Sequence, residues 1–138
     1  MAPIGYSGTS LAKKLGYDKP PLTVWTVHAP KEFKTWLGDL PAGVKITTRE
    51  TSSIEAAHIF VVDSAEMNAL LSRLRHILKQ NGFVWVSWYK KSAKIPTDIT
   101  EDLIREIAIP LGFVDVKVCA IDSVWSGLKL VIRKSERI

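Results

Sequence analysis

The sequence predicts a three-layer α/β fold: a Rossmann-like, mostly parallel sheet with helices on both faces and an antiparallel hairpin at its carboxyl end. Apolar, β-branched segments of strand length alternate along the chain with segments of helical periodicity, which is typical of βαβ units. Residues 58–62 are apolar on both faces, as strands in the middle of a parallel sheet are. The segments at 113–121 and 128–132 are separated by one short turn, which suits antiparallel pairing.

The chain has 138 residues, 46% of them hydrophobic, which is enough for one core. We therefore predict a single α/β domain over residues 22–138. Residues 1–21 are predicted to form an N-terminal segment with a short helix, because Thr9 or Ser10 can cap a helix there and Gly16 can end it.

The first half of the domain alternates between strand and helix signals. Pro30 suits the first turn of a helix, and Gly38 suits its end. The predicted elements are a strand at 22–28, a helix from Pro30 to Gly38, a strand at 44–48, a loop at 49–55 and a strand at 58–62.

The second half begins with the clearest helix of the chain. Ser64 is its predicted cap, apolar residues recur at helical spacing up to Leu78, and Asn81-Gly82 is its predicted end. A strand at 83–88, a basic loop at 89–94, a helix at 97–109 and the terminal hairpin follow. Asp98 at the cap of the last helix, with Glu101 three residues later, resembles a capping box.

Composition excludes several classes of protein. The single cysteine, Cys119, cannot form an internal disulfide and lies in an apolar run, so we interpret it as a small buried residue. No Cys/His spacing suggests a metal site. The chain has neither a secretion signal nor an apolar run long enough for a membrane span, so we expect a cytoplasmic protein. The net charge of +5 allows an anionic partner, although the lysines are scattered.

Two resemblances extend this interpretation. Residues 78–86 run from a helix end through a glycine into an apolar strand, and a long strand with a return hairpin follows. In these features the second half resembles the closing half of Rossmann-type methyltransferases that use S-adenosylmethionine. Over nearly the whole chain, the sequence resembles an uncharacterised family of short bacterial proteins known as a domain of unknown function. Residues 6–16, 97–102 and 117–128 carry that second resemblance, which implies a fold and no particular chemistry.

The junction after the first strand argues against a nucleotide cofactor. Dinucleotides and related cofactors need glycines there, so that the backbone can approach the ligand at a helix start. Residues 27–33 contain no glycine, and Pro30 lacks an N–H donor. We therefore expect no cofactor. Glu50, just after the second strand, could correspond to an acid that holds a ribose, but we interpret it as a surface loop residue.

A candidate site remains at the carboxyl edge of the sheet, where ligands of open parallel sheets bind. Lysines, tryptophans and the start of the last predicted helix should meet there and form a pocket for an anionic or nucleotide-like ligand. The predicted ligand-binding residues are Trp88, Lys90, Lys91, Asp98, Asp122, Trp125 and Ser126. The alternative interpretation is that the tryptophans cover the core, Asp98 caps its helix and the lysines face water.

The sequence favours a non-enzymatic binding or interaction module, built on a methyltransferase-like fold that lacks the glycine loop. The competing hypothesis is an enzyme or sensor that binds a small anionic or nucleotide-like ligand at the carboxyl edge. No nucleophile with a matching base is recognisable, so no catalytic residue is predicted. The expected partner is a small anion or a protein. Nucleic acid is less favoured, because no recognised nucleic-acid motif is present.

Overall fold

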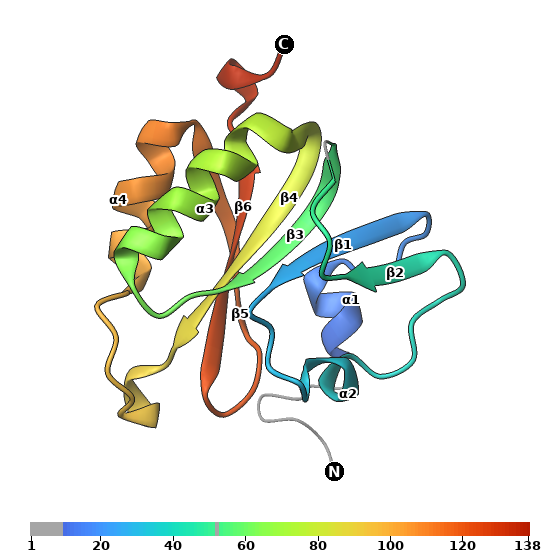
Figure 1. The fold of residues 1–138 in the computed structure, drawn as a ribbon, viewed down its shortest axis with the longest axis horizontal. Coiled ribbons are helices and arrows are strands. Elements are labelled where there is room, and N and C mark those ends of the chain that lie inside the picture. Colours follow the sequence, from blue (N-terminus) through green and yellow to red (C-terminus); the bar gives the residue numbers. More distant parts are fainter. Residues whose placement is uncertain (1–9, 52) are drawn as a thin grey trace.

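The computed structural model describes residues 10–51 and 53–138 and contains a six-stranded sheet with helices on both faces (Figure 1). Short helices and the first strands occupy the first half of the chain, and the longer elements occupy the second. In order, the elements are α1 (Leu11–Leu15), β1 (Leu22–Val27), α2 (Phe33–Leu37), β2 (Val44–Thr47), β3 (Ile54–Phe60), α3 (Ser64–Ile77), β4 (Leu78–Tyr89), η1 (Lys91–Ala93), α4 (Glu101–Leu111), β5 (Phe113–Ala120), β6 (Trp125–Ile132) and η2 (Lys134–Glu136).

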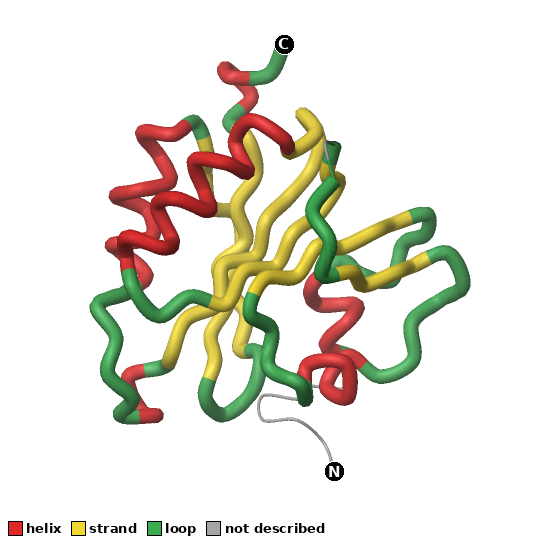
Figure 2. Tube along the Cα trace, viewed as in Figure 1, coloured by secondary structure: helices red, strands yellow, loops and turns green. Residues whose placement is uncertain are grey.

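The strands lie in the order β2-β1-β3-β4-β6-β5 (Figure 2). β1 pairs in parallel with β2 and β3, and β3 pairs in parallel with β4. β6 is antiparallel to both of its neighbours and lies between β4 and β5. β4 and β5 therefore run in the same direction and end at the same edge of the sheet. The predicted α/β fold, its mostly parallel sheet and its terminal hairpin are confirmed.

Each face of the sheet has its own hydrophobic core. On one face α3 and α4 pack over the sheet through buried residues such as Leu74 and Ile104. On the other face α1 and α2 pack over the sheet through residues such as Leu15 and Phe33, together with Trp85 of β4. This two-sided burial explains why β3 and β4 read as continuous apolar runs in the sequence.

The N-terminal helix has the predicted caps. The side chain of Ser10 accepts a hydrogen bond from the backbone N–H of Lys13, at 3.2 Å. Gly16 ends the helix with a φ of 82°, a conformation that favours glycine. Thr9, the alternative cap, and the rest of the predicted segment at residues 1–9 lie outside the described residues. α1 packs firmly on the sheet, and the indole N–H of Trp85 donates to the backbone oxygen of Leu15 at 2.8 Å.

Two predicted boundaries around α3 are wrong. The third strand begins at Ile54 rather than at residue 58, because Ile54 pairs with Leu78 of β4, and Ala56 and Ala57 have partners on both β1 and β4. α3 ends at Ile77, before the predicted Asn81-Gly82 stop, and the chain enters β4 directly. Ile54 lies opposite Leu78 but Ala56 lies opposite Phe83, so β4 is irregular between them. Gly82 is required there, since a Cβ would lie 2.6 Å from the backbone oxygen of Glu55.

The caps of the two long helices also differ from prediction. The side chain of Asp63, and not that of Ser64, accepts from the N–H of Glu66 at 2.8 Å. Thr100 caps α4 by accepting from the N–H of Leu103 at 3.1 Å, so the predicted cap at Asp98 is wrong. Thr100 and Asp98 are both ordinary cap residues, and only tertiary contacts distinguish them.

We expect the two faces of α4 to respond differently to the same substitution. Ile104 is fully buried, whereas Ile109 is 41% exposed. Ile104→Ala should lower the free energy of unfolding by about 2–5 kcal/mol, because it leaves a cavity in the core. Ile109→Ala should cost less than about 1 kcal/mol. Urea denaturation of both variants measures the difference, and equal losses would mean that the buried face of α4 is assigned wrongly.

Candidate functional site

The loop after β4 and the turn between β5 and β6 lie side by side at the carboxyl edge of the sheet. The backbone N–H of Lys90 donates to the oxygen of Val124 at 2.8 Å. Asp122 orders the turn by accepting from the N–H groups of Val124, at 2.9 Å, and Trp125, at 2.7 Å. The predicted adjacency of these two segments is therefore present in the structure.

Strand alternation nevertheless divides the predicted site between the two faces of the sheet. Trp88 lies opposite Ser126, and Tyr89 lies opposite Trp125. Because paired residues share a face and consecutive residues alternate, Trp88 faces the α3 and α4 layer while Trp125 faces the α1 and α2 layer. The ring of Trp125 packs against Tyr89, with centroids 4.3 Å apart, and against Phe60 at 5.1 Å. Trp125 is thus a core residue of the second face.

Asp98 connects the segment before α4 to the start of α3. Its carboxylate accepts from the backbone N–H of Ser64 at 2.9 Å and from the hydroxyl of Ser64 at 2.6 Å. Ser64 is the first residue of α3, so Asp98 places a negative charge at the amino end of that helix, where the helix dipole favours it. Asp98 and Asp122 therefore have structural roles, and neither lines the cavity described next.

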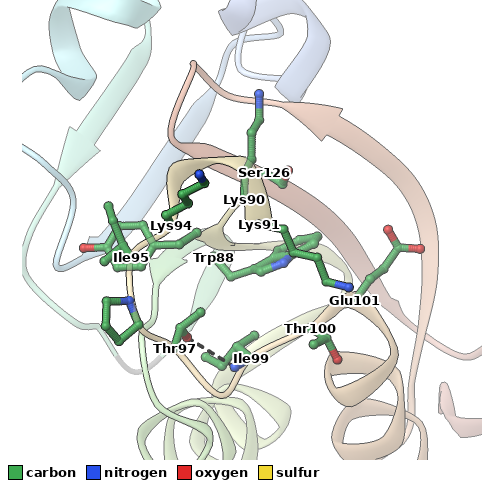
Figure 3. A pocket seen from close by; sticks show the side chains of 12 residues that line it. Trp88, Lys90, Lys91, Lys94, Ile95, Thr97, Ile99, Thr100, Glu101 and Ser126 are labelled. Atoms are coloured by element: carbon green, nitrogen blue, oxygen red, sulfur yellow. Dashed lines mark hydrogen bonds between the residues drawn. The ribbon is translucent and has the colours of Figure 1, made fainter.

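A cavity of about 590 Å³ lies beside Trp88, between the hairpin and the start of α4 (Figure 3). Four of the seven predicted ligand-binding residues line it, namely Trp88, Lys90, Lys91 and Ser126. The other lining residues come from β4, the following loop and the first residues of α4: Tyr89, Lys94, Ile95, Pro96, Thr97, Ile99, Thr100 and Glu101. The structure thus brings together the tryptophan, lysines and serine of the prediction and leaves out Asp98, Asp122 and Trp125.

The loop that closes the cavity is held in place by its own hydrogen bonds. The hydroxyl of Thr97 donates to the backbone oxygen of Val62 and accepts from the N–H of Ile99 at 3.2 Å. Ile99 is buried in the core beneath α4. Lys94 adopts a φ of 55°, which turns the chain back after the short helix η1. The loop is therefore held at both ends, by Thr97 against the segment that follows β3 and by Lys90 against the turn between β5 and β6.

Electrostatics give the cavity a positive rim. Three lysines contribute to its lining, and Glu101 is the one carboxylate among the lining residues. The carboxylate of Glu101 accepts from the guanidinium of Arg105 at 2.5 Å, which offsets its charge. This bond, together with one to Asp115, raises the pKa of Arg105. Figure 3 shows the side chain of Lys91 extending towards Glu101, whereas that of Lys90 extends away from Trp88.

Sequence reasoning missed the apolar wall of the cavity. Ile95, 40% exposed, and Pro96 follow the basic run directly in the sequence. An isoleucine placed between the basic run and a proline is the sequence signal that could have indicated an apolar wall. The contribution of Thr97 and Thr100 depends on how the loop folds back, and no local pattern indicates it.

A buried chain of hydrogen bonds crosses the sheet on the α1 side. The hydroxyl of Tyr17 lies 2.9 Å from Nδ1 of His58, and Nε2 of His58 lies 2.6 Å from the hydroxyl of Ser87. All three side chains are fully buried. Burial lowers the pKa of His58 to about 3 and raises that of Tyr17, so His58 is neutral, and one of its ring nitrogens donates a hydrogen bond while the other accepts one. This serine–histidine pair is closed to solvent and serves the core.

We expect His58 to make stability depend on pH. Its pKa is about 3 in the folded protein and near 6.5 when exposed, so the unfolded chain binds the extra proton between these values. The free energy of unfolding should therefore fall by up to ~1.4 kcal/mol per pH unit as the pH decreases from about 6.5. His58→Gln should remove this slope between pH 6.5 and 5 in urea denaturation, whereas His76→Gln should retain it. An unchanged slope in His58→Gln would contradict this role.

The end of β1 does not fit a nucleotide cofactor. His28 makes the turn with a φ of 57°, and its Nδ1 lies 3.3 Å from a carboxylate oxygen of Glu66. α2 has only five residues, and its cap residue Glu32 makes no side-chain capping bond. Side chains occupy every position of the junction, where a cofactor would need bare backbone. Glu50 is paired with Arg73 of α3, so it is engaged rather than available for a ribose.

Comparison with solved structures places this fold among methyltransferases. The Burkholderia thailandensis 1,6-didemethyltoxoflavin-N1-methyltransferase, solved with S-adenosylhomocysteine, matches with a TM-score of 0.56 and 11% identity over 90% of this chain and 75% of that one. The ribosomal protein L11 methylase of Lactobacillus delbrueckii subsp. bulgaricus matches with a TM-score of 0.54 and 14% identity over 89% and 76% of the respective chains. At such identities the likeness shows a shared fold.

The magnesium protoporphyrin IX methyltransferase of Synechocystis PCC 6803, solved with S-adenosylmethionine, matches with a TM-score of 0.50 and 16% identity over 64% of this chain. The chain spans 46% of the length of that enzyme, less than two thirds of it. The fold class is thus a methyltransferase-like Rossmann fold.

No model of a known protein family and no curated protein matches the chain in sequence. The resemblance to a bacterial family of short proteins therefore stays a prediction. None of the helices in residues 10–51 and 53–138 is long and apolar enough to cross a membrane. Over the same residues, no group of three or more His, Cys, Asp or Glu side chains is placed to hold a metal ion.

We expect S-adenosylmethionine not to bind, because the junction at residues 27–33 offers no glycine and Pro30 removes a donor. Isothermal titration calorimetry should give no heat of binding at micromolar protein and millimolar ligand. A dissociation constant in the micromolar range would refute the assignment of this junction as a degenerate cofactor loop.

Proposed function

We propose that the protein is a non-enzymatic binding module that takes a small anionic ligand in the cavity beside Trp88. The observation that carries this proposal is the positive rim of a cavity at the carboxyl edge of the sheet, where the one lining carboxylate is already paired with Arg105. A cavity of about 590 Å³ has the size of ordinary small-molecule sites. An anion there would gain charge-assisted hydrogen bonds from the lysines.

The chemistry of the lining residues supports binding without catalysis. The hydroxyl of Thr97 donates to a backbone oxygen, and that of Thr100 caps α4. No histidine lines the cavity, and the serine–histidine pair in the described part of the chain is fully buried on the other face of the sheet. Ser126 therefore has no histidine among the lining residues that would activate it as a nucleophile.

An enzymatic function is the second candidate, and the methyltransferase-like fold favours it. In that case the cavity would hold the substrate, and one of the lysines would be the group able to polarise it or to transfer a proton. The poor fit of the β1 junction to S-adenosylmethionine weighs against methyl transfer from that donor. The two candidates share the cavity and differ in whether the bound anion is changed.

Removal of lysine charge from the rim should weaken anion binding. We expect AMP and inorganic phosphate at millimolar concentration to raise the melting temperature, since a ligand at a hundredfold excess over its dissociation constant adds roughly 2.7 kcal/mol. A double variant, Lys91→Gln with Lys94→Gln, should bind at least about tenfold more weakly. The matched control is Lys45→Gln, an exposed lysine on β2 at the far side of the sheet.

Calorimetry on the three proteins measures the affinities. Equal affinity of the double variant and the parent protein would refute the proposal, as would an equal loss in Lys45→Gln. Analysis of the recovered ligand by mass spectrometry distinguishes the two candidates, because a pure binding module returns the anion unchanged.

A further inference from the structure

The cavity has an unusual base for an anion site. The indole of Trp88 lies across it in Figure 3, between the loop and the start of α4. Trp88 is only 8% exposed and belongs to the core beneath α3 and α4, so its ring is held in one orientation and a small part of it reaches the cavity. A fixed aromatic side chain at the base of a cavity favours contact with a flat ring, offset-stacked or edge-to-face, over a flexible aliphatic chain.

The loop provides a second apolar surface. Ile95 and Pro96 line the cavity together with the buried Ile99. Ile95 is 40% exposed, although it lies in a loop whose ends are held by hydrogen bonds from Thr97 to Val62 and from Lys90 to Val124. A ligand with an apolar body would cover this side chain, and the burial of apolar area would favour its binding. An inorganic anion would leave the wall exposed.

The polar groups are placed at the rim and not at the base. Lys91 extends along the rim towards Thr100 and Glu101, and Ser126 lies on the hairpin side of Trp88 (Figure 3). The pairing of Glu101 with Arg105 prevents that carboxylate from repelling an anion at this end. The cavity therefore combines an apolar interior with a cationic rim.

From this division we infer that the ligand is a planar aromatic acid, with its ring against Trp88 and its acid group at Lys91. The inference rests on the proposed anion-binding function and adds the class of ligand. An aromatic ring with a carboxylate satisfies both halves of the cavity, whereas a phosphate satisfies the rim alone and a neutral ring satisfies the interior alone.

Three probes separate these contributions. They are 2-naphthoate, which has the ring and the charge, cyclohexanecarboxylate, which has the charge without a flat ring, and 2-naphthamide, which has the ring without the charge. Isothermal titration calorimetry should show that 2-naphthoate binds at least about tenfold more tightly than either of the others. Binding should also quench tryptophan fluorescence, and Trp88→Leu should reduce both the quenching and the affinity.

A matched pair of surface variants avoids dependence on a core substitution. Ile95→Ser should weaken 2-naphthoate binding several-fold and leave phosphate binding nearly unchanged. Ile109→Ser is the control, because Ile109 has nearly the same exposure, 41% against 40%, and lies near the end of α4 away from the cavity. Circular dichroism confirms that each variant is folded.

The outcomes distinguish the inference from the proposed function. Equal affinity for 2-naphthoate and cyclohexanecarboxylate, with both lost in the lysine double variant, would overturn the aromatic ligand and leave the anion site standing. Equal affinity for 2-naphthoate and 2-naphthamide would overturn both, since charge would then play no part. Absence of binding by all three probes, by AMP and by phosphate would also overturn both.

Discussion

The insertion of β6 between β4 and β5 determines how the rest of the molecule is arranged. β6 forms antiparallel ladders with both neighbours, and Ser126 comes to lie opposite Trp88. Because β4 and β5 end at the same edge, the loop after β4 meets the hairpin turn there, and α4 must cross one face of the sheet between them. The cavity is a consequence of this topology, since its base, hairpin side and helix side come from three segments that the pairing of β6 brings together.

The same pairing explains why the two neighbouring aromatic residues at the end of β4 have different roles. Trp88 and Tyr89 point to opposite faces, and each meets a different core. On the α1 side, Tyr89 and Trp125 complete an aromatic cluster that also contains Phe60. On the α4 side, no large side chain of the hairpin opposes Trp88, because its cross-strand partner is a serine. The small size of Ser126 therefore leaves the space that the ligand would occupy.

Much of this fold was predictable from local pattern, and the failures have physical causes. The apolar stripe of α3 and the terminal hairpin follow directly from residue periodicity. The start of β3 was missed because Glu55 interrupts its apolar run, and only the pairing of its neighbours Ile54 and Ala56 with β4 extends the strand past it. At the candidate site, the proximity of the loop after β4 and the turn between β5 and β6 was predictable, because β4 and β5 run in the same direction. The bond from Asp98 to Ser64 joins residues 34 positions apart, and no spacing rule indicates it.

The link between α1 and the sheet also affects where the folded unit begins. Tyr17 bonds His58, and the oxygen of Leu15 accepts from the indole of Trp85, all within the interior. A protein shortened to start at β1 would expose the aromatic surface beneath α1 and leave His58 and Trp85 with unmatched polar atoms away from water. Such a fragment would be prone to associate through that surface. Expression of the sheet alone should therefore yield aggregates, because residues 11–17 cover part of its second face.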